Sequence, residues 1–309
     1  MISFARLLLR RVALLVALLA AVFVAVDLLP GNTARAVLGR EATPEQIAAK
    51  EHQLGLDRPL PVRFWDWISG VATGDFGHTA RGRSVNELLI DKFPPTLLLG
   101  GLALAITVFA SLALGAWWVT RPGSAATRVL QPATTTAVAI PEFVISTVLI
   151  LVFALALGWL PAVTITDRSG FPAGPDMLVL PVLALALPQI GWNTRVVRAA
   201  LADAAEAPHV ESAVLDGLST RVVLARHVLP FALPTIVASF ATTVGMLLGG
   251  SLVVETIFNY PGLGAVLAGS VADRDTSVVA AVVALSGVVI MGMLAAADGI
   301  RAWSLRGRR

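Results

Sequence analysis

Apolar and polar residues alternate in long blocks along this chain. Six apolar blocks approach or exceed the ~18–20 residues that a helix needs to cross a lipid bilayer. They lie at residues 12–29, 96–119, 133–157, 177–197, 229–254 and 277–297. A long polar segment follows the first block, and a shorter polar stretch, residues 206–230, leads into the fifth. The pattern predicts an all-α polytopic membrane protein with six transmembrane helices.

The same blocks predict three parts of the chain. Residues 1–29 form an N-terminal tail and the first transmembrane helix. Residues 30–93 form an external, periplasmic-side segment. Residues 94–309 form a five-helix transmembrane core, which includes a cytoplasmic loop at residues 199–228.

Arginine residues indicate which ends of the blocks face the cytoplasm, because loops rich in Lys and Arg stay on that side. The residues that flank the first and last blocks are Arg6, Arg10, Arg11, Arg301, Arg306, Arg308 and Arg309. We therefore expect a multi-pass protein of the cell (inner or plasma) membrane with both termini in the cytoplasm. The N-terminal run resembles a signal peptide, but it is long and lacks a cleavage pattern, which favours an uncleaved first span.

Composition agrees with a membrane protein and limits the chemistry. The chain is 56% hydrophobic and 14% charged, whereas soluble domains carry about 25% charged residues. The net charge of +3 is small, and the basic residues flank apolar blocks, so we expect contact with lipid and not with nucleic acid. The absence of cysteine excludes disulfides, thiolate metal sites and cysteine catalysis.

Polar and helix-disturbing residues lie inside several blocks. Pro141 and Glu142 fall within the third block, and a glutamate there must face protein or water. Pro181 and Pro188 are expected to break the fourth block. Small residues that allow close helix packing occur in the fifth block, namely Ala238, Ser239, Gly245, Gly249 and Gly250.

The polar stretch 206–230 is typical of two short helices. Pro208 suits the first turn of the first helix, and Val210, Ala213 and Val214 form an apolar stripe along it. Gly217 is expected to end this helix in the left-handed conformation. Ser219 is placed to cap a second helix that runs through Arg226 and His227. A solvated helix pair without chemistry of its own indicates a docking surface for another protein.

The external segment carries further local signals. Thr43-Pro44-Glu45-Gln46 resembles a helix start, and Gly74-Asp75-Phe76-Gly77 resembles a turn. An amphipathic helix is indicated by Phe64, Trp65, Trp67 and Ile68. These aromatic residues are either structural parts of a folded cap or a landing site for an external partner.

A second external stretch follows the fifth block. We single out Glu255, Asn259, Tyr260, Pro261, Gly262 and Gly264 as an external turn or gate region. Pro261 and Gly262 suit the two central positions of a type II turn.

The chain shows no source of energy for transport. Neither lysine, Lys50 or Lys92, lies in a phosphate-binding loop, and the histidines lack metal-ligand spacing. Glu142 is the plausible ionisable group at mid-membrane, and no partner for it is evident. No hydrolase motif or other catalytic constellation is found. We therefore expect a subunit of a larger machine and no enzyme activity, catalytic residue, metal or cofactor in this chain.

The polar stretch resembles a loop of the membrane subunits of bacterial binding-protein-dependent ABC importers, with the pattern Glu-Ala-Ala-x3-Gly-x9-Ile-x-Leu-Pro. Here Glu211-Ser212-Ala213, Gly217 and Leu229-Pro230 match it, with Ser212 and His227 as departures. Residues 55–79 (GLDRPLPVRFWDWISGVATGDFGHT) and 249–264 (GGSLVVETIFNYPGLG) resemble the dipeptide/oligopeptide (peptide/nickel) permeases. The chain is identified as a member of that family, with the type I importer permease architecture.

The resemblance implies a role for the loop and a set of partners. In the family this loop forms coupling helices that dock into a groove on an ATP-binding subunit. Here the coupling residues would be Glu211, Ser212, Ala213, Asp216, Gly217, Leu229 and Pro230. The acidic Glu211 and Asp216 depart from the basic loop of many relatives. The partners would be two ATP-binding subunits that hold ATP and Mg, a second homologous permease and an external substrate-binding protein.

We expect the cargo to be short peptides. The same machinery could instead import nickel, glutathione or haem, since specificity lies largely in the binding protein. An alternative of another class is an ion-driven secondary carrier, which would take up its substrate without ATPase subunits.

Overall fold

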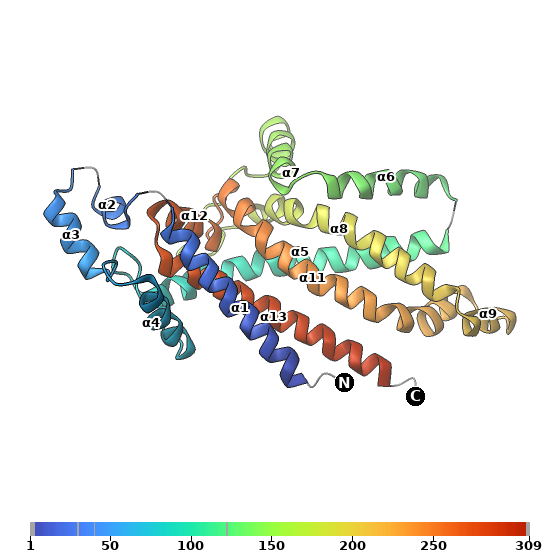
Figure 1. The fold of residues 1–309 in the computed structure, drawn as a ribbon. Coiled ribbons are helices and arrows are strands. Elements are labelled where there is room, and N and C mark those ends of the chain that lie inside the picture. Colours follow the sequence, from blue (N-terminus) through green and yellow to red (C-terminus); the bar gives the residue numbers. More distant parts are fainter. Residues whose placement is uncertain (1–3, 30, 40, 122, 307–309) are drawn as a thin grey trace. The chain divides into compact units, whose positions relative to one another are not determined.

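The computed structural model describes residues 4–29, 31–39, 41–121 and 123–306, and they fold almost entirely as helices (Figure 1). In these residues strand-like pairing is confined to two isolated bridges, His78 with Ser84 and Thr166 with Pro172. The prediction of an all-α fold is confirmed. The elements in chain order are α1 Phe4–Asp27, α2 Thr33–Leu38, α3 Pro44–Gln53, α4 Leu60–Ala72, α5 Val85–Thr120, α6 Ala125–Ala139, α7 Glu142–Leu149, π-helix η1 Ile150–Ala156, α8 Asp176–Ala205, α9 Pro208–Leu215, α10 Thr220–Val222, π-helix η2 Val223–Val228, α11 Leu229–Ile257, α12 Leu263–Asp273 and α13 Thr276–Arg306.

Five described helices are long and apolar enough to cross a membrane, or up to six if a bent pair counts as one span. The five are Leu9–Asp27, Val85–Thr120, Asp176–Ala205, Thr220–Ile257 and Thr276–Ile300. The bent pair, Thr127–Ala139 with Glu142–Ala156, corresponds to the third apolar block. The six predicted blocks therefore all form apolar helices.

The third block, predicted as one span with Pro141 and Glu142 inside it, is a pair of helices bent by 107°. Pro141 explains the break, because it disfavours the helical conformation at the preceding residue. Ile140 accordingly adopts an extended conformation, with φ −89° and ψ 122°, and α7 begins afresh at Glu142. By contrast, the predicted breaks at Pro181 and Pro188 are wrong, since α8 continues through both.

The helix that contains the second apolar block is longer than the block. Helix α5 begins at Val85, well before the expected start at Thr96, and it contains Pro94 and Pro95. The first turns of α5 are polar, as Glu87 and Asp91 illustrate, and they belong to the segment that we predict to be external.

The chain divides into two compact units, and each has its own core. The first unit comprises Met1–Thr96 and Pro261–Val289. Its core joins Leu19 and Phe23 of α1 to Trp67 of α4 and to Val278 and Ala281 of α13.

Helix α4 is amphipathic, as predicted. Trp67 is 8% exposed, and the Phe23 ring centroid lies 5.2 Å from that of Trp67 and 5.3 Å from that of Phe64. Ile68 packs against the same core, whereas Trp65 on the opposite face is 71% exposed. Three of the four apolar residues of this stretch are therefore structural.

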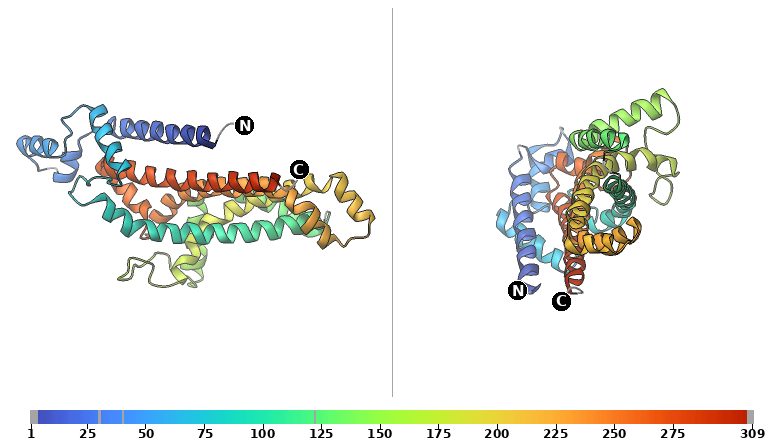
Figure 2. Two further views of the ribbon diagram at one scale, coloured as in Figure 1. Left: turned by 90° about the horizontal axis from the view of Figure 1, so that it is seen from below. Right: turned by 90° about the vertical axis from the view of Figure 1, so that its right-hand side faces the viewer.

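The second unit comprises Leu97–Tyr260 and Ile290–Arg309. Helix α8 lies beside α11 along much of its length, and α6 packs on α8 (Figures 1 and 2). Glycine sets the closest approach, because a Cβ on Gly191 of α8 would lie 2.7 Å from the Thr134 carbonyl oxygen of α6. Of the small residues singled out in the fifth block, Gly249 has open space around a built Cβ, so it does not set a helix contact.

Candidate coupling loop and external surface

Helix α9 forms the candidate coupling helix in the second unit. Pro208 occupies its first turn as predicted, where a missing N–H costs little. Val210 and Ala213 are buried, but Val214 is 57% exposed, so the predicted apolar stripe is wrong at that residue. Leu215, at 80% exposure, lies beside Val214 on the exposed side.

The exposed side of α9 combines apolar and acidic residues. Large apolar side chains there are Val214, Leu215 and Leu218, and the polar ones are Glu211, Ser212 and Asp216. Contiguous exposed apolar side chains rimmed by polar ones are typical of protein interaction sites. The predicted coupling residues Glu211, Ser212 and Asp216 are thus accessible, whereas Ala213 is buried beneath them.

Gly217 ends α9, as predicted. Its φ is 77°, the left-handed region that favours glycine. The Gly217 N–H donates to the Val214 carbonyl at 3.0 Å, and the Leu218 N–H donates to the Ala213 carbonyl at 3.2 Å. These two bonds form a Schellman motif, which fixes the direction in which the chain leaves α9.

The predicted second short helix is not separate. The chain re-enters a helix at Thr220, passes through η2 and continues without interruption into α11. Leu229 and Pro230 therefore lie within a long helix and not at the end of a loop. A π-helix accommodates this sequence, because Pro230 cannot donate a backbone hydrogen bond to the preceding turn. Ser219 has an extended conformation at the helix start, but its side chain makes no capping bond, so the predicted cap is wrong.

Two histidines tie α9 to the start of α11, a contact that sequence reasoning missed. Nε2 of His209 lies 3.0 Å from the His227 carbonyl oxygen, to which the protonated nitrogen donates. The His209 ring centroid lies 4.2 Å from that of Phe231. Beneath this contact, Val210 packs in a core that also contains Val228 and Ile236. Helix α9 is thus firmly attached to α11.

The predicted type II turn at Pro261-Gly262 is wrong. Gly262 is extended, with φ −99° and ψ −164°, whereas a type II turn requires a positive φ there. The positive φ belongs to Asn259, at 49°. The Tyr260 N–H donates to the Glu255 carbonyl at 2.8 Å, and the Asn259 N–H donates to the Thr256 carbonyl at 3.4 Å. Helix α11 therefore ends in a second Schellman motif.

The other residues of the predicted gate region are interior. Glu255 is fully buried and Tyr260 is 1% exposed. Burial raises the pKa of the Tyr260 hydroxyl, and the charge of Glu255 raises that pKa further. In the first unit, Gly264 is buried at the start of α12, which follows the extended Gly262. Each of these positions is therefore buried in its own unit, and the gate role stays a prediction.

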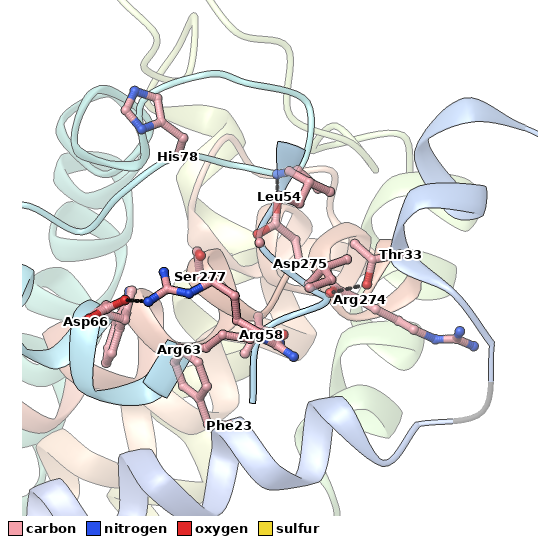
Figure 3. A pocket seen from close by; sticks show the side chains of 15 residues that line it. Phe23, Thr33, Leu54, Arg58, Arg63, Asp66, His78, Arg274, Asp275 and Ser277 are labelled. Carbon is pink, nitrogen blue, oxygen red and sulfur yellow. Dashed lines mark hydrogen bonds and ion pairs between the residues drawn. The ribbon is translucent and has the colours of Figure 1, made fainter. Parts of the chain in front are cut away.

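The first unit carries a charged pocket of about 190 Å³ (Figure 3). Arg58 and Asp66 of its wall form an ion pair at 2.6 Å, and Arg63 of its wall pairs with Asp27 at 2.9 Å. Arg274 also lines it, with a left-handed φ of 56°.

Asp275 lines this pocket and links two segments of the chain. Its Oδ2 accepts the Ala80 N–H at 2.6 Å, and its Oδ1 accepts the Val278 N–H at 3.3 Å. Burial raises the pKa of the Asp275 carboxyl, although these hydrogen bonds oppose the shift. Because one carboxylate joins residues far apart in sequence, sequence reasoning did not find it.

Comparisons with known proteins identify the family of this chain. The family model described as binding-protein-dependent transport system inner membrane component matches residues 96–309, and the N-terminal model of the same system matches residues 1–100. The glutathione transport system permease protein GsiC of Salmonella choleraesuis (strain SC-B67) is 36% identical over 268 residues, covering 85% of this chain and 84% of that protein. GsiC of Escherichia coli (strain K12) is 34% identical over the same length and coverage.

Solved structures share the fold of the chain. An amino acid ABC transporter with histidines matches with a TM-score of 0.51 and 19% identity, over 68% of this chain and 90% of that one. The inward-facing MetNI methionine ABC transporter matches with a TM-score of 0.52 and 19% identity, over 69% of this chain and 93% of that one.

Proposed function

Because the chain belongs to the family of binding-protein-dependent transport system inner membrane components, we propose that it is the permease subunit of an importer for small peptides such as glutathione. Family membership makes the chain a multi-pass inner-membrane permease of an ABC importer and not itself an ATPase. The proposed cargo rests on the similarity to GsiC proteins over 85% of this chain.

The exposed face of α9 supports docking to an ATP-binding subunit. Val214, Leu215 and Leu218 offer apolar contacts, and Glu211 and Asp216 rim them. Two such subunits bind ATP and Mg and carry out the hydrolysis. Their closure moves α9, and the contact between His209 and His227 passes that movement to α11.

The distribution of charge supports the orientation and the external partner. Both termini lie in the cytoplasm, since arginines flank the first and last apolar helices. The charged pocket of the first unit then faces the periplasm, where a substrate-binding protein delivers cargo. A second homologous permease completes the enclosure of the path.

Two alternatives make different predictions. Nickel or haem as cargo requires the same machinery with a different binding protein. An ion-driven carrier requires uptake by this chain alone, and family membership argues against it.

Reconstitution tests the proposal. The permease, its partner permease, the two ATP-binding subunits and the binding protein are placed in liposomes, and uptake of labelled glutathione is measured with and without ATP. We expect uptake that requires ATP and every subunit. Uptake by this chain alone would refute the importer mechanism. Import of nickel or haem without glutathione would refute the cargo.

A further inference from the structure

A cavity of about 470 Å³ opens beside the break between α6 and α7 in the second unit. Residues 138–142 of the break form part of its wall. Pro188, Gln189 and Trp192 of α8 and Met246 of α11 form the rest. All these segments belong to helices that are candidate membrane spans, or to the bent pair that contains the break, so the cavity lies among candidate membrane spans.

Glu142 contributes a carboxylate to this cavity. It is the first residue of α7, where the helix dipole favours a negative charge. A Cβ built on Gly250 of α11 would lie 3.5 Å from Oε1 of Glu142, so the side chain is directed towards α11. Among the described residues, the carboxylate makes no hydrogen bond or ion pair. An ionisable group inside a membrane is costly unless something solvates or pairs with it.

Gln189 provides an independent indication of a ligand. Gln189 is 5% exposed, and Oε1 of its side-chain amide is buried without a hydrogen-bond partner in the described structure. One turn further along α8, Asn193 donates to Oγ1 of Thr243 at 2.8 Å and accepts from Oγ of Ser239 at 2.7 Å. Asn193 is thus satisfied while Gln189, which lines the cavity, is not, and buried amides normally find a partner.

We propose that this cavity binds the ammonium group of a peptide substrate during its passage, an inference that rests on the proposed function. The carboxylate of Glu142 forms a charge-assisted hydrogen bond with the ammonium group. The Gln189 amide pairs with the adjacent peptide group, and the ring of Trp192, which is 41% exposed, offers a face for a cation. No Lys, Arg or His lines the cavity among the described residues, which favours a cationic group over an anionic one.

Thiol labelling tests the charge of the cavity. The chain has no cysteine, so Met246→Cys places a single thiol of this subunit at the cavity wall. The assembled complex without binding protein is labelled with methanethiosulfonate reagents that carry either trimethylammonium or sulfonate. Glu142→Gln in the Met246→Cys background should lower the ratio of cationic to anionic labelling rates by about tenfold, as a 1.4 kcal/mol attraction would give. Asp176→Asn, which removes a carboxylate of the same unit outside the cavity lining, should leave the ratio unchanged.

Protection tests the ligand. S-methylglutathione, which has a free ammonium group and no thiol, should slow labelling, and its N-acetyl derivative should not. Gln189→Leu should weaken protection without changing the charge selectivity of labelling. The inference is overturned if both peptides protect equally, or if Glu142→Gln leaves the rate ratio unchanged, while the unaltered complex imports glutathione. Failure of the unaltered complex to import glutathione overturns the proposed cargo instead.

Discussion

Replacement of Gly217 by valine tests whether the end of α9 couples ATP hydrolysis to transport. Gly217 has a φ of 77°, and nothing lies within 4 Å of a Cβ built on it. A side chain there meets no steric clash, so the cost is that of the backbone conformation alone. That cost is about 1–2 kcal/mol for a non-glycine residue, and a β-branched residue lies at the upper end.

This backbone cost is enough to disrupt the Schellman motif but not to unfold the protein. The motif contains two hydrogen bonds, each worth about 0.5–1.5 kcal/mol net. A strain of about 2 kcal/mol therefore offsets much of their contribution. The core beneath α9 contains Val210 and Ala213 and remains intact, because the substitution touches neither.

Uptake and ATP hydrolysis are measured together in the reconstituted importer. We expect Gly217→Val to lower the number of peptides imported per ATP by about tenfold, the factor that 1.4 kcal/mol gives, with normal assembly. Gly217→Asn should retain most transport, since asparagine tolerates the left-handed region. The matched control is Gly170→Val, because Gly170 has a φ of 84° and equally open space in another loop. Normal transport by Gly217→Val, or equal loss in Gly170→Val, would refute the role of Gly217.

Three further predictions concern stability. Asp275→Ala should lower the free energy of unfolding by about 2–4 kcal/mol, as a helix cap is lost and the buried Ala80 N–H is left unpaired. The raised pKa of Asp275 means that the folded state favours the protonated carboxyl. The wild-type protein should therefore lose stability as pH rises from the ordinary pKa of 3.8 through the raised pKa. Thermal unfolding in detergent should show this loss in the wild type and not in Asp275→Ala. Gly191→Ala should lower the melting temperature, because overpacking against α6 costs about 1–3 kcal/mol. The control Gly249→Ala should not lower it, because the built Cβ has open space around it. Equal melting temperatures of the two variants would contradict the close approach of α8 and α6. Asn259→Gly should unfold at or above the wild-type temperature and Asn259→Val below it, because only the latter strains a φ of 49°; an unchanged Asn259→Val would argue against the Schellman motif.

Some local signals predicted short elements of the fold correctly. Thr43 and Gln46 form the reciprocal capping box expected from their spacing, and Pro208 and Gly217 bound α9 as expected. Thr43 and Gln46 lie within one helical turn of each other, and Pro208 and Gly217 each act at one end of α9. The apolar blocks were equally informative, because a length of about 20 apolar residues has few structural solutions.

Signals that depend on distant partners could not be read from the sequence. The turn residues Pro261 and Gly262 match a type II turn, yet Asn259 ends α11 first and removes the need for that turn. Asp275 also accepts the N–H of Ala80, and no local pattern connects these two residues. The histidine contact of α9 was missed for the same reason.

The prolines of the third and fourth blocks illustrate why packing decides between a kink and a break. Pro181 and Pro188 are buried in α8, which packs against α6, α7 and α11, so neighbouring helices support a helix that continues through both residues. At Pro141 the chain instead turns away, and the break leaves Glu142 at a cavity and not within a closed helical face. Proline alone predicts neither result. An acidic residue directly after a proline does favour the break, because its carboxylate is stabilised at the N-terminus of the new helix. The sequence Pro141-Glu142 therefore held a signal for both the bend and the candidate ammonium site.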